Sequence, residues 1–594
     1  MNNRKSIPPK YAQRFLRWFI RDEITEEVQG DLEENFYLTL KNKSLYRANL
    51  NYWFQVLNYL RPFAIRKSTT IYFNHSAMFQ SYFKIGWRNI LRNKGYSAIN
   101  IGGLALGMAV AMLIGLWVLD ELSFNKYHRN YGSIARLYRR ESSRGEIYVN
   151  PVQPTGLGTL LKADYSSHFK QVVLVRSRTE DRVIASGDKK FTQSGYFMQD
   201  GGPEMFSLRM KYGTLDGLKE MNSILLSETL SRKLFGDMNP VNQVVSMDAR
   251  IELKVTGVYK DLPKNSEFSE AAYFAPIELF LYGWADLNVW NNYNMFIYAQ
   301  INPNESFEEI SALIRNVMLP HIDDEKRNTK PELFLLPMRK WHLDSRFENG
   351  VQVTSEKMKV VRLFGIIAVF VLLLACINFM NLSTARSERR AREVGIRKSI
   401  GSLRSQLVQQ FLGESLLVTL IAFVFSLIIV QLSLNGFNRL ADKEMSMPWT
   451  NPMFWTACLA FNLVTGLLAG SYPALYLSSF KPVKVLKGAI ITDRFSRLPR
   501  RALVIIQFTV SLSLALSTII VYQQIQFAKN RPSGYSREAL ISFRTASPEF
   551  RGKFNLLRTE LINTGVVEDI AESNYSVTSI LGWNDGFSWK GQKI

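Results

Sequence analysis

The sequence predicts an α-helical protein that crosses a membrane several times and carries an inserted extracytoplasmic mixed α/β domain between its first two spans. Several apolar runs are long enough to cross a bilayer, which takes about 20 mainly apolar residues. One long stretch of ordinary polar sequence, residues 120–361, separates the first run from the second. Basic residues crowd beside alternate ends of the runs, a distribution typical of polytopic membrane proteins.

The apolar residues are concentrated in a few segments, although the mean hydropathy of the 594 residues is close to zero. We predict five spans, at residues 95–119, 363–382, 411–434, 454–477 and 502–527. Soluble buried helices are seldom this long without a charge, so a membrane location is the better interpretation of these runs.

The net charge of +22 indicates an acidic partner, and either nucleic acid or an anionic membrane surface would satisfy it. The basic residues lie next to the apolar runs, which favours membrane lipid, so no nucleic-acid partner is expected. The positive-inside rule then places residues 385–405 and the basic loop 481–501 in the cytoplasm, together with the N-terminus. Residues 120–361 and 528–594 would lie outside.

The N-terminal 70 residues mix charges with aromatic residues at helical spacing, which predicts a small cytoplasmic helical prefix domain at 1–70. Residues 71–94 combine aromatic residues with Lys84 and Arg88. This combination favours an interfacial helix that leads into the first span. A further core helix of the prefix domain is the alternative.

The inserted segment, residues 120–361, has the alternating strand-like and helix-like pieces of a folded domain. Strand-like pieces occur at 172–175, 251–259 and 296–301, and helix-like pieces at 228–235 and 306–317. The segment contains neither GxSxG nor HExxH, so catalysis is not expected there. The two cysteines fall in apolar runs and the five histidines have no ligand spacing, so no metal or cofactor site is predicted.

The segment at 385–405 reads ARSERRAREVGIRKSIGSLRS and lies between two predicted spans. A short, stiff, basic element joined to two spans is well placed to be pushed by a soluble partner. We therefore interpret it as a cytoplasmic coupling helix. The alternative is that its charges only orient the spans.

Two further features concern the spans themselves. Gly103 and Gly107 form a GxxxG pair, which permits close helix approach either between subunits or within one. Glu414 lies near the start of the third span, where it would reach water or pair with Arg404. An intramembrane carboxylate is also a candidate functional group.

The passage from the fifth span into residues 528–594 is similar to the passage from the first span into the inserted domain. Both leave the membrane through an Asn/Lys/Arg-rich connector with Tyr and continue into a strand-like piece. This repeat predicts the start of a second periplasmic domain at 528–594. The chain would then be part of a longer, duplicated protein.

Several passages together resemble the MacB/FtsX-like family of ABC transporter permeases. They are WRNILRNKGYSAINIGGLALGMA, SETLSRKLFGDMNPVNQVV, KVTGVYKDLPKNSEF, INFMNLSTARSERRAREVGIRKSIGS and GSYPALYLSSFKPVKVLKG. The N-terminal 70 residues are similar to the prefix domain found ahead of some such permeases. The resemblance implies that 120–361 is a MacB-like periplasmic core domain and that the full protein is the duplicated eight-span form.

The resemblance also implies partners and a mechanism. A separate P-loop ATPase would bind ATP and Mg, and the chain itself contains no GxxxxGK[ST]. Closure of the ATPase would move the periplasmic domain, and a second permease half or copy would complete the unit. A periplasmic adaptor and an outer-membrane channel are further candidate partners. The protein would be a non-catalytic, multi-pass component of the bacterial inner membrane.

For the coupling helix, the resemblance implies docking into the ATPase. Val394 and Ile396 would enter a groove while the basic residues face its acidic rim. The candidate coupling residues are Arg389, Arg390, Arg392, Glu393, Val394, Gly395, Ile396, Arg397, Lys398 and Gly401.

The expected function is export or efflux of peptides, lipoproteins or drugs. One alternative is a regulator that transmits ATPase motion to a periplasmic cell-wall hydrolase. Another is a membrane receptor that works without an ATPase.

Overall fold

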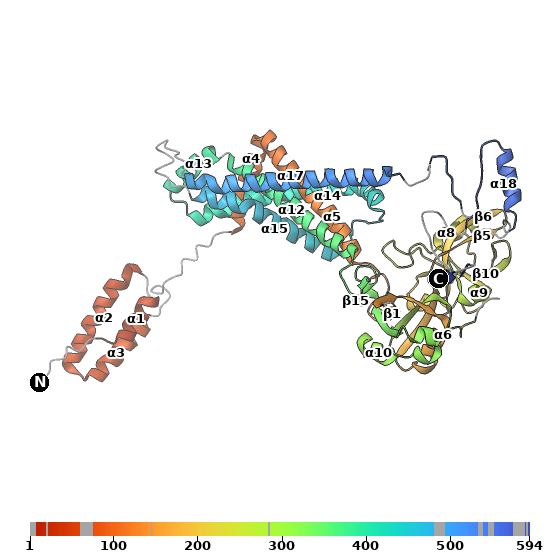
Figure 1. The fold of residues 1–594 in the computed structure, drawn as a ribbon. Helices are drawn as coiled ribbons and strands as arrows, with labels where there is room; N and C mark the ends of the chain where they lie inside the picture. Colours follow the sequence, from red (N-terminus) through yellow and green to blue (C-terminus); the bar gives the residue numbers. More distant parts are fainter. Residues whose placement is uncertain are drawn as a thin grey trace.

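The structure is a computed structural model. It describes residues 8–19, 22–59, 75–143, 145–282, 286–385, 387–479, 494–532, 538–543, 550, 552–573, 588–589 and 592–593. A small three-helix bundle, a bundle of long apolar helices and an α/β domain follow one another in space (Figure 1). Most of the predicted basic loop, residues 481–493, lies outside the described residues.

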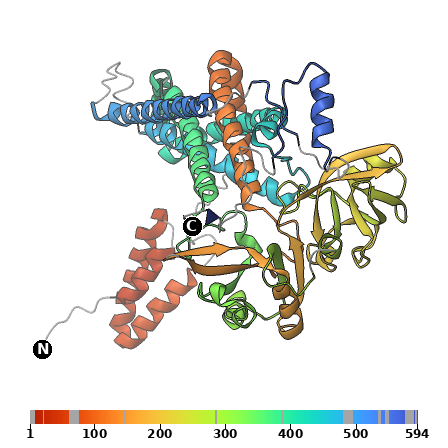
Figure 2. The same cartoon turned by 45° about the vertical axis from the view of Figure 1, so that its right-hand side comes forward.

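The N-terminal bundle consists of α1 (Lys10–Phe19), α2 (Asp22–Asn42) and α3 (Leu45–Asn58). Its core is formed by residues that recur at helical spacing: Ala12, Leu16, Val28, Leu32, Phe36, Ala48, Tyr52 and Val56. This bundle stands apart from the long apolar helices in both views (Figures 1 and 2).

The long helices cover the five predicted spans. They are α5 (Lys94–Leu122), α12 (Glu356–Ala385), α14 (Arg404–Ala441), α15 (Pro452–Ser478) and α17 (Arg494–Asn530). Each contains a segment long and apolar enough to cross a membrane. Because α17 begins at Arg494, the last eight residues of the predicted basic loop 481–501 are helical instead. Four of these eight residues are arginine, which favours helix.

The helices α5, α12, α14 and α15 pack around a shared apolar core. Its buried residues are Leu104, Ala105, Met108, Cys376, Phe379, Ala422, Phe423, Cys458 and Ala469. The fifth long helix, α17, lies against α12, where the Asn381 amide donates to Gln507 Oε1 at 3.1 Å. Polar contacts of this kind join helices where lipid supplies no hydrophobic driving force.

The predicted interfacial segment 71–94 contains α4 (His75–Arg92), which packs along α14. The approach is close, since a Cβ built on Gly86 would lie 3.0 Å from Leu417 Cδ2. A break at Asn93 separates α4 from α5. The structure therefore places this helix beside a predicted span, not within the prefix bundle.

The inserted domain is built on a 13-stranded mixed sheet whose main path runs β11-β8-β10-β9-β5-β6-β4-β12-β1-β13. The path strands are β1 (Ile134–Ser143), β4 (Phe169–Arg176), β5 (Glu180–Ser186), β6 (Lys189–Met198), β8 (Ser223–Ser227), β9 (Val244–Met247), β10 (Ile251–Tyr259), β11 (Tyr273–Pro276), β12 (Tyr293–Ile301) and β13 (Glu332–Pro337). Off this path lie β2 (Glu146–Asn150), β3 (Val152–Pro154) and β7 (Met210–Gly213).

Short helices connect the strands. They are α6 (Thr155–Asp164), α7 (Gly202–Met205), α8 (Glu228–Phe235), α9 (Ile277–Leu281), α10 (Phe307–Ile314), η1 (Leu319–His321), α11 (Asp324–Arg327) and η2 (Met338–Lys340). A hairpin of β14 (Phe347–Glu348) and β15 (Val351–Gln352) precedes α12.

Both faces of the sheet are buried. Along β12, Met295, Ile297 and Ala299 belong to one core, and Tyr298 belongs to the other. Alternate strand residues point to opposite faces, so a strand covered on both sides needs apolar residues at successive positions. Of the pieces predicted from sequence, 251–259 and 228–235 coincide with β10 and α8. The other three overlap β4, β12 and α10.

Beyond α17, the described residues contain α18 (Phe554–Asn563) and the short pair β16 (Ser588–Trp589) and β17 (Gln592–Lys593). The second periplasmic domain expected at 528–594 stays a prediction.

Candidate functional site

The coupling segment forms the helix α13 (Ser387–Ser399), which is shorter than the helix predicted at 385–405. Gly401 ends it, with φ +103°. Its N–H donates to Lys398 O, and the N–H of Ser402 donates to Arg397 O. This pair of bonds is a Schellman motif, which glycine favours because it adopts positive φ without a side-chain clash. Arg404 therefore begins α14 instead of ending α13.

The C-terminal half of α13 is fixed to the protein's own long helices. Val394 is 1% exposed and packs with Leu407, Phe411, Ala474 and Leu477 of α14 and α15. In this conformation Val394 cannot enter a partner's groove, which corrects the role expected for it. Its apolar side chain lowers the free energy by packing against neighbouring helices instead.

Polar contacts hold α13 in the same place. Arg397 Nη1 donates to Gln410 Oε1 at 2.5 Å, and Gln410 in turn donates to Glu414 Oε1. Arg397 also pairs with Glu393 one turn earlier, at 2.7 Å. Lys398 Nζ donates to the carbonyl of Ser478 at the end of α15. The side chain of Glu414 is thus buried within this network.

Three apolar side chains are exposed on α13 and in the turn that follows it. Ile396 is 49% exposed, Ile400 is 81% exposed and Leu403 is 59% exposed. We name these three residues the α13 patch. Sequence reasoning named only Ile396, although Ile400 follows it by four residues and was therefore detectable as a neighbour on the same side.

Among the remaining predicted coupling residues, Gly395 is buried on α13. The side chains of Arg389, Arg390 and Arg392 lie outside the described part of the structure, although the backbone there is helical. Their role in contacting a partner stays a prediction.

The two glycines of the first span face α12 of the same chain. A Cβ on Gly107 would lie 2.4 Å from Ala375 Cβ, and one on Gly103 would lie 3.4 Å from Asn378 Nδ2. Close backbone approach between α5 and α12 therefore requires glycine at position 107. In this structure the GxxxG pair serves packing within one chain.

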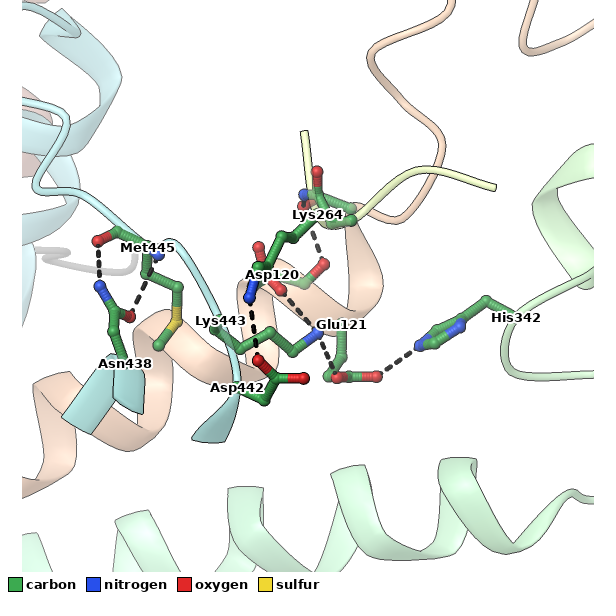
Figure 3. Close-up of polar contacts among 10 residues, drawn as sticks. Asp120, Glu121, Lys264, His342, Asn438, Asp442, Lys443 and Met445 are labelled. Carbon is green, nitrogen blue, oxygen red and sulfur yellow. Dashed lines mark hydrogen bonds and ion pairs between the residues drawn. The ribbon is translucent and has the colours of Figure 1, made fainter. Parts of the chain in front are cut away.

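At the C-terminal end of α14, a cluster of charged side chains joins the inserted domain to the long helices (Figure 3). Lys443 Nζ lies 2.9 Å from Asp120 Oδ2 and 2.7 Å from Glu121 Oε1. The other carboxylate oxygen of Glu121 lies 2.6 Å from His342 Nε2. Lys264 pairs with Asp442 at 2.9 Å. We name these six residues the juncture.

The juncture brings three parts of the chain together. Asp120 and Glu121 end α5, Asp442 and Lys443 follow α14, and Lys264 and His342 belong to the inserted domain. The loop after α14 is held by Asn438, whose amide donates to Met445 O and accepts from Met445 N (Figure 3). This pair of bonds fixes the loop that presents Asp442 and Lys443.

The electrostatics of the juncture favour the charged form of Lys443. Burial alone would lower the pKa of Lys443, but its hydrogen bonds to Glu121 and Asp120 outweigh burial and raise that pKa. The side chains of Lys443, Asp120 and Glu121 are all less than one fifth exposed. Lys264 and Asp442 are far more exposed, so water and salt weaken their pair.

Backbone contacts reinforce the same connection. Asn125, just after α5, donates from its N–H to Asn265 O at 2.8 Å, and its side chain accepts from the N–H of Glu267. The ring of Phe124 stacks on His342 with centroids 3.9 Å apart. The inserted domain is therefore held at its base by side-chain, backbone and aromatic contacts.

In the part of the chain that the structure describes, no group of three or more His, Cys, Asp or Glu residues could hold a metal ion. The juncture contains carboxylates, but its cations occupy them. Its arrangement suits mechanical connection rather than ligand binding.

The fold and these contacts define a polytopic membrane protein in which an inserted α/β domain is tied to a bundle of spans. The family model of the MacB-like periplasmic core domain matches residues 97–317, and that of the FtsX-like permease C-terminal region matches residues 365–482. The chain belongs to the MacB/FtsX-like family of ABC transporter permeases. Membership implies an ABC ATPase partner.

Individual relatives are distant. The uncharacterized ABC transporter permease YknZ of Bacillus subtilis is 22% identical over 414 residues, which cover 67% of this chain and 96% of YknZ. The macrolide export ATP-binding/permease protein MacB of Bdellovibrio bacteriovorus is 20% identical over 420 residues, covering 68% of this chain and 61% of that protein. The chain thus spans about three fifths of that MacB.

Among solved structures, the periplasmic region of MacB from Actinobacillus actinomycetemcomitans matches part of this chain. The TM-score is 0.26 at 16% identity, and the match covers 35% of this chain and 91% of that structure.

Proposed function

We propose that this chain is the transmembrane permease subunit of an ABC transporter complex and passes motion from a separate ATPase to the inserted domain. The observation that carries the proposal is that one helix, α14, contacts the coupling helix α13 at its start and the juncture at its end. At its first turns Gln410 binds Arg397 of α13. Just past its last turn Lys443 pairs with Asp120 and Glu121, and Glu121 in turn contacts His342 of the inserted domain.

The geometry of α14 makes it suitable as a lever. It has 38 residues, and at 1.5 Å per residue that gives a length of about 57 Å, enough to span a bilayer. Interhelical packing with α5 and α15 resists bending. A displacement of α13 by an ATPase would therefore reach the juncture with little loss.

The α13 patch is the proposed contact for the ATPase. Its three apolar side chains are exposed at the end of the helix bundle remote from the inserted domain. Exposed apolar residues rimmed by polar ones are typical of protein interaction sites. The basic residues Arg389, Arg390 and Arg392 would face acidic groups at the rim.

The remaining elements of the proposal follow from family membership. The N-terminus and α13 would be cytoplasmic, the inserted domain would lie outside the bacterial inner membrane, and a second permease half or copy would complete the unit. ATP and Mg would bind only the partner ATPase, and this chain would be non-catalytic. Export or efflux is the expected process, in line with the name of the Bdellovibrio relative.

The test is a binding and coupling experiment on the complex in proteoliposomes. The double variant Ile396→Ser/Ile400→Ser should bind the ATPase about 30-fold more weakly, which corresponds to ~2 kcal/mol, a typical loss for central apolar contacts. Stimulation of ATP hydrolysis by the permease should fall in parallel.

The control is Leu440→Ser, which changes a similarly exposed side chain (86%) at the opposite end of α14. It should leave ATPase binding unchanged. Wild-type affinity in the Ile396→Ser/Ile400→Ser variant would contradict the proposed contact.

A further inference from the structure

Helix α3 of the N-terminal bundle has two apolar faces. One face, Ala48, Tyr52 and Val56, is buried in the bundle core. The other face carries four large apolar side chains that are exposed by about half or more: Tyr46 (74%), Leu50 (55%), Phe54 (67%) and Leu57 (49%). Their spacing of four, four and three residues places them in one stripe. We name this stripe the α3 outer face.

A helix on the surface of a small soluble bundle normally presents polar residues outward. Here the outward stripe runs along the whole 14-residue helix. Trp53 extends its margin, where the indole contacts Phe15 of α1 at a centroid distance of 6.1 Å. A contiguous exposed stripe of this kind, unlike scattered single residues, marks an interaction surface.

The charges on α3 and next to it in the sequence are all positive. No Asp or Glu occurs between Glu34 and Asp120. Lys41 in the last turn of α2, Lys43 in the loop and Arg47 in the first turn of α3 are exposed. Three more cations follow it in the sequence, namely Arg61, Arg66 and Lys67. The acidic residues of the bundle are instead concentrated in the first part of α2, at Asp22, Glu23, Glu26, Glu27, Asp31, Glu33 and Glu34.

The position of the bundle allows it to meet the membrane. It lies toward the end of the long helices that is opposite the inserted domain (Figure 1). Residues 60–74 connect α3 to α4, and 15 residues can span at most about 50 Å. The bundle is therefore confined to the neighbourhood of the bilayer that the same chain crosses.

We infer that the α3 outer face docks on the anionic lipid surface of this bilayer. Leu50, Phe54 and Leu57 would enter the boundary between headgroups and acyl chains. Tyr46 and Trp53 suit the headgroup level, where amphipathic rings are enriched. Lys41, Lys43 and Arg47 would face lipid phosphates. The acidic part of α2 would point away from the lipid, because neighbouring helices of a bundle present different outward faces.

The positive charge near the α3 outer face favours an anionic lipid surface over a second copy of the bundle as the docking partner. Two α3 outer faces packed together would bring the cations of both copies close to one another, with no acidic residue on either α3 to pair with them. Like charges across an interface oppose association. An anionic surface satisfies both the apolar stripe and the positive charge.

The test uses the full chain in nanodiscs that hold one copy each. The native Cys376 and Cys458 are replaced by Ala, and Leu50→Cys is labelled with a polarity-sensitive fluorophore. In discs containing phosphatidylglycerol, the emission should shift to the blue and be quenched by doxyl-lipids. Both effects should weaken in phosphatidylcholine discs and at high salt.

Two controls accompany the measurement. A label at Glu34→Cys, on the exposed surface of α2, should report water in both lipids. Replacing Lys41, Lys43 and Arg47 by Gln should weaken the blue shift of the Leu50→Cys label, with at least about a tenfold loss of docking. These cations are exposed, so the bundle should keep its fold.

The inference is overturned if the Leu50→Cys label reports water in phosphatidylglycerol discs that hold one chain. It is also overturned if the label becomes protected only when two chains share a disc, because a second copy would then be the occupant.

Discussion

Lys443 is the residue that we expect to matter most for the connection between the inserted domain and the spans. Replacing it by Met would leave Asp120 and Glu121 largely buried without their shared cation. Removing one partner of a buried charge pair costs more than the pair contributes, because the remaining charge is uncompensated. We expect a loss of roughly 2 kcal/mol, seen as a lower apparent melting temperature of the purified protein in detergent.

The matched control for this substitution is Lys264→Met, at the same juncture. The partner of Lys264 is Asp442, whose side chain is 92% exposed, so water already solvates that charge. No measurable change in melting temperature is expected. Equal shifts for the two variants would show that burial does not set the strength of these contacts.

At the scale of the element, the turn between α13 and α14 depends on Gly401. A Cβ at this position would meet no atom within 4 Å, so Gly401→Ala tests backbone conformation alone. Because φ is +103°, the alanine should destabilise the turn by ~1 kcal/mol. We expect about fivefold faster trypsin cleavage near Arg397 and Lys398, since cleavage follows the population of the open turn.

The control is Gly436→Ala, a glycine inside α14 that also has open space around it. Alanine favours helix there, so cleavage should be unchanged or slower. Faster cleavage in both variants would mean that added bulk, rather than backbone strain at Gly401, opens the structure.

Elements with a strong local signal could be predicted from sequence. The five apolar runs predicted the long helices because span length is set by bilayer thickness. The helix at 228–235 was predicted to the residue, and its start is fixed locally, since Ser227 accepts from the N–H of Leu230. The C-terminal end of α13 was not predicted correctly, although Gly401 marks it.

The candidate sites depended on contacts between distant residues, which one sequence does not reveal. Lys443 pairs with Asp120, and in the sequence it is only one charge of a short, nearly balanced loop. Val394 was interpreted as a docking residue from the family resemblance, whereas the structure packs it against Leu407 and Leu477. Burial of a single apolar residue in a polar helix becomes visible only when the neighbouring helices are placed.

At the scale of the whole molecule, the juncture implies that the inserted domain and the end of α14 move together. Lys443, just after α14, pairs with Asp120 and Glu121 at the end of α5. Glu121, Phe124 and Asn125 in turn contact the inserted domain. Spin labels at Met238→Cys in the inserted domain and Leu440→Cys at the end of α14 should therefore keep one distance when the complexed ATPase binds ATP. Both positions are exposed, so labels should be tolerated.

The comparison for this measurement is the pair Met238→Cys and Tyr148→Cys, which lies within the inserted domain and reports the spread of the labels alone. If α14 works as a lever, the two pairs should have equally narrow distance distributions with and without ATP. A shift confined to the Met238–Leu440 pair would mean that the juncture is a hinge. A hinge between two bodies transmits no torque about its axis, so motion of α13 would then stop at the membrane surface. The inserted domain would have to be moved through contacts other than the juncture.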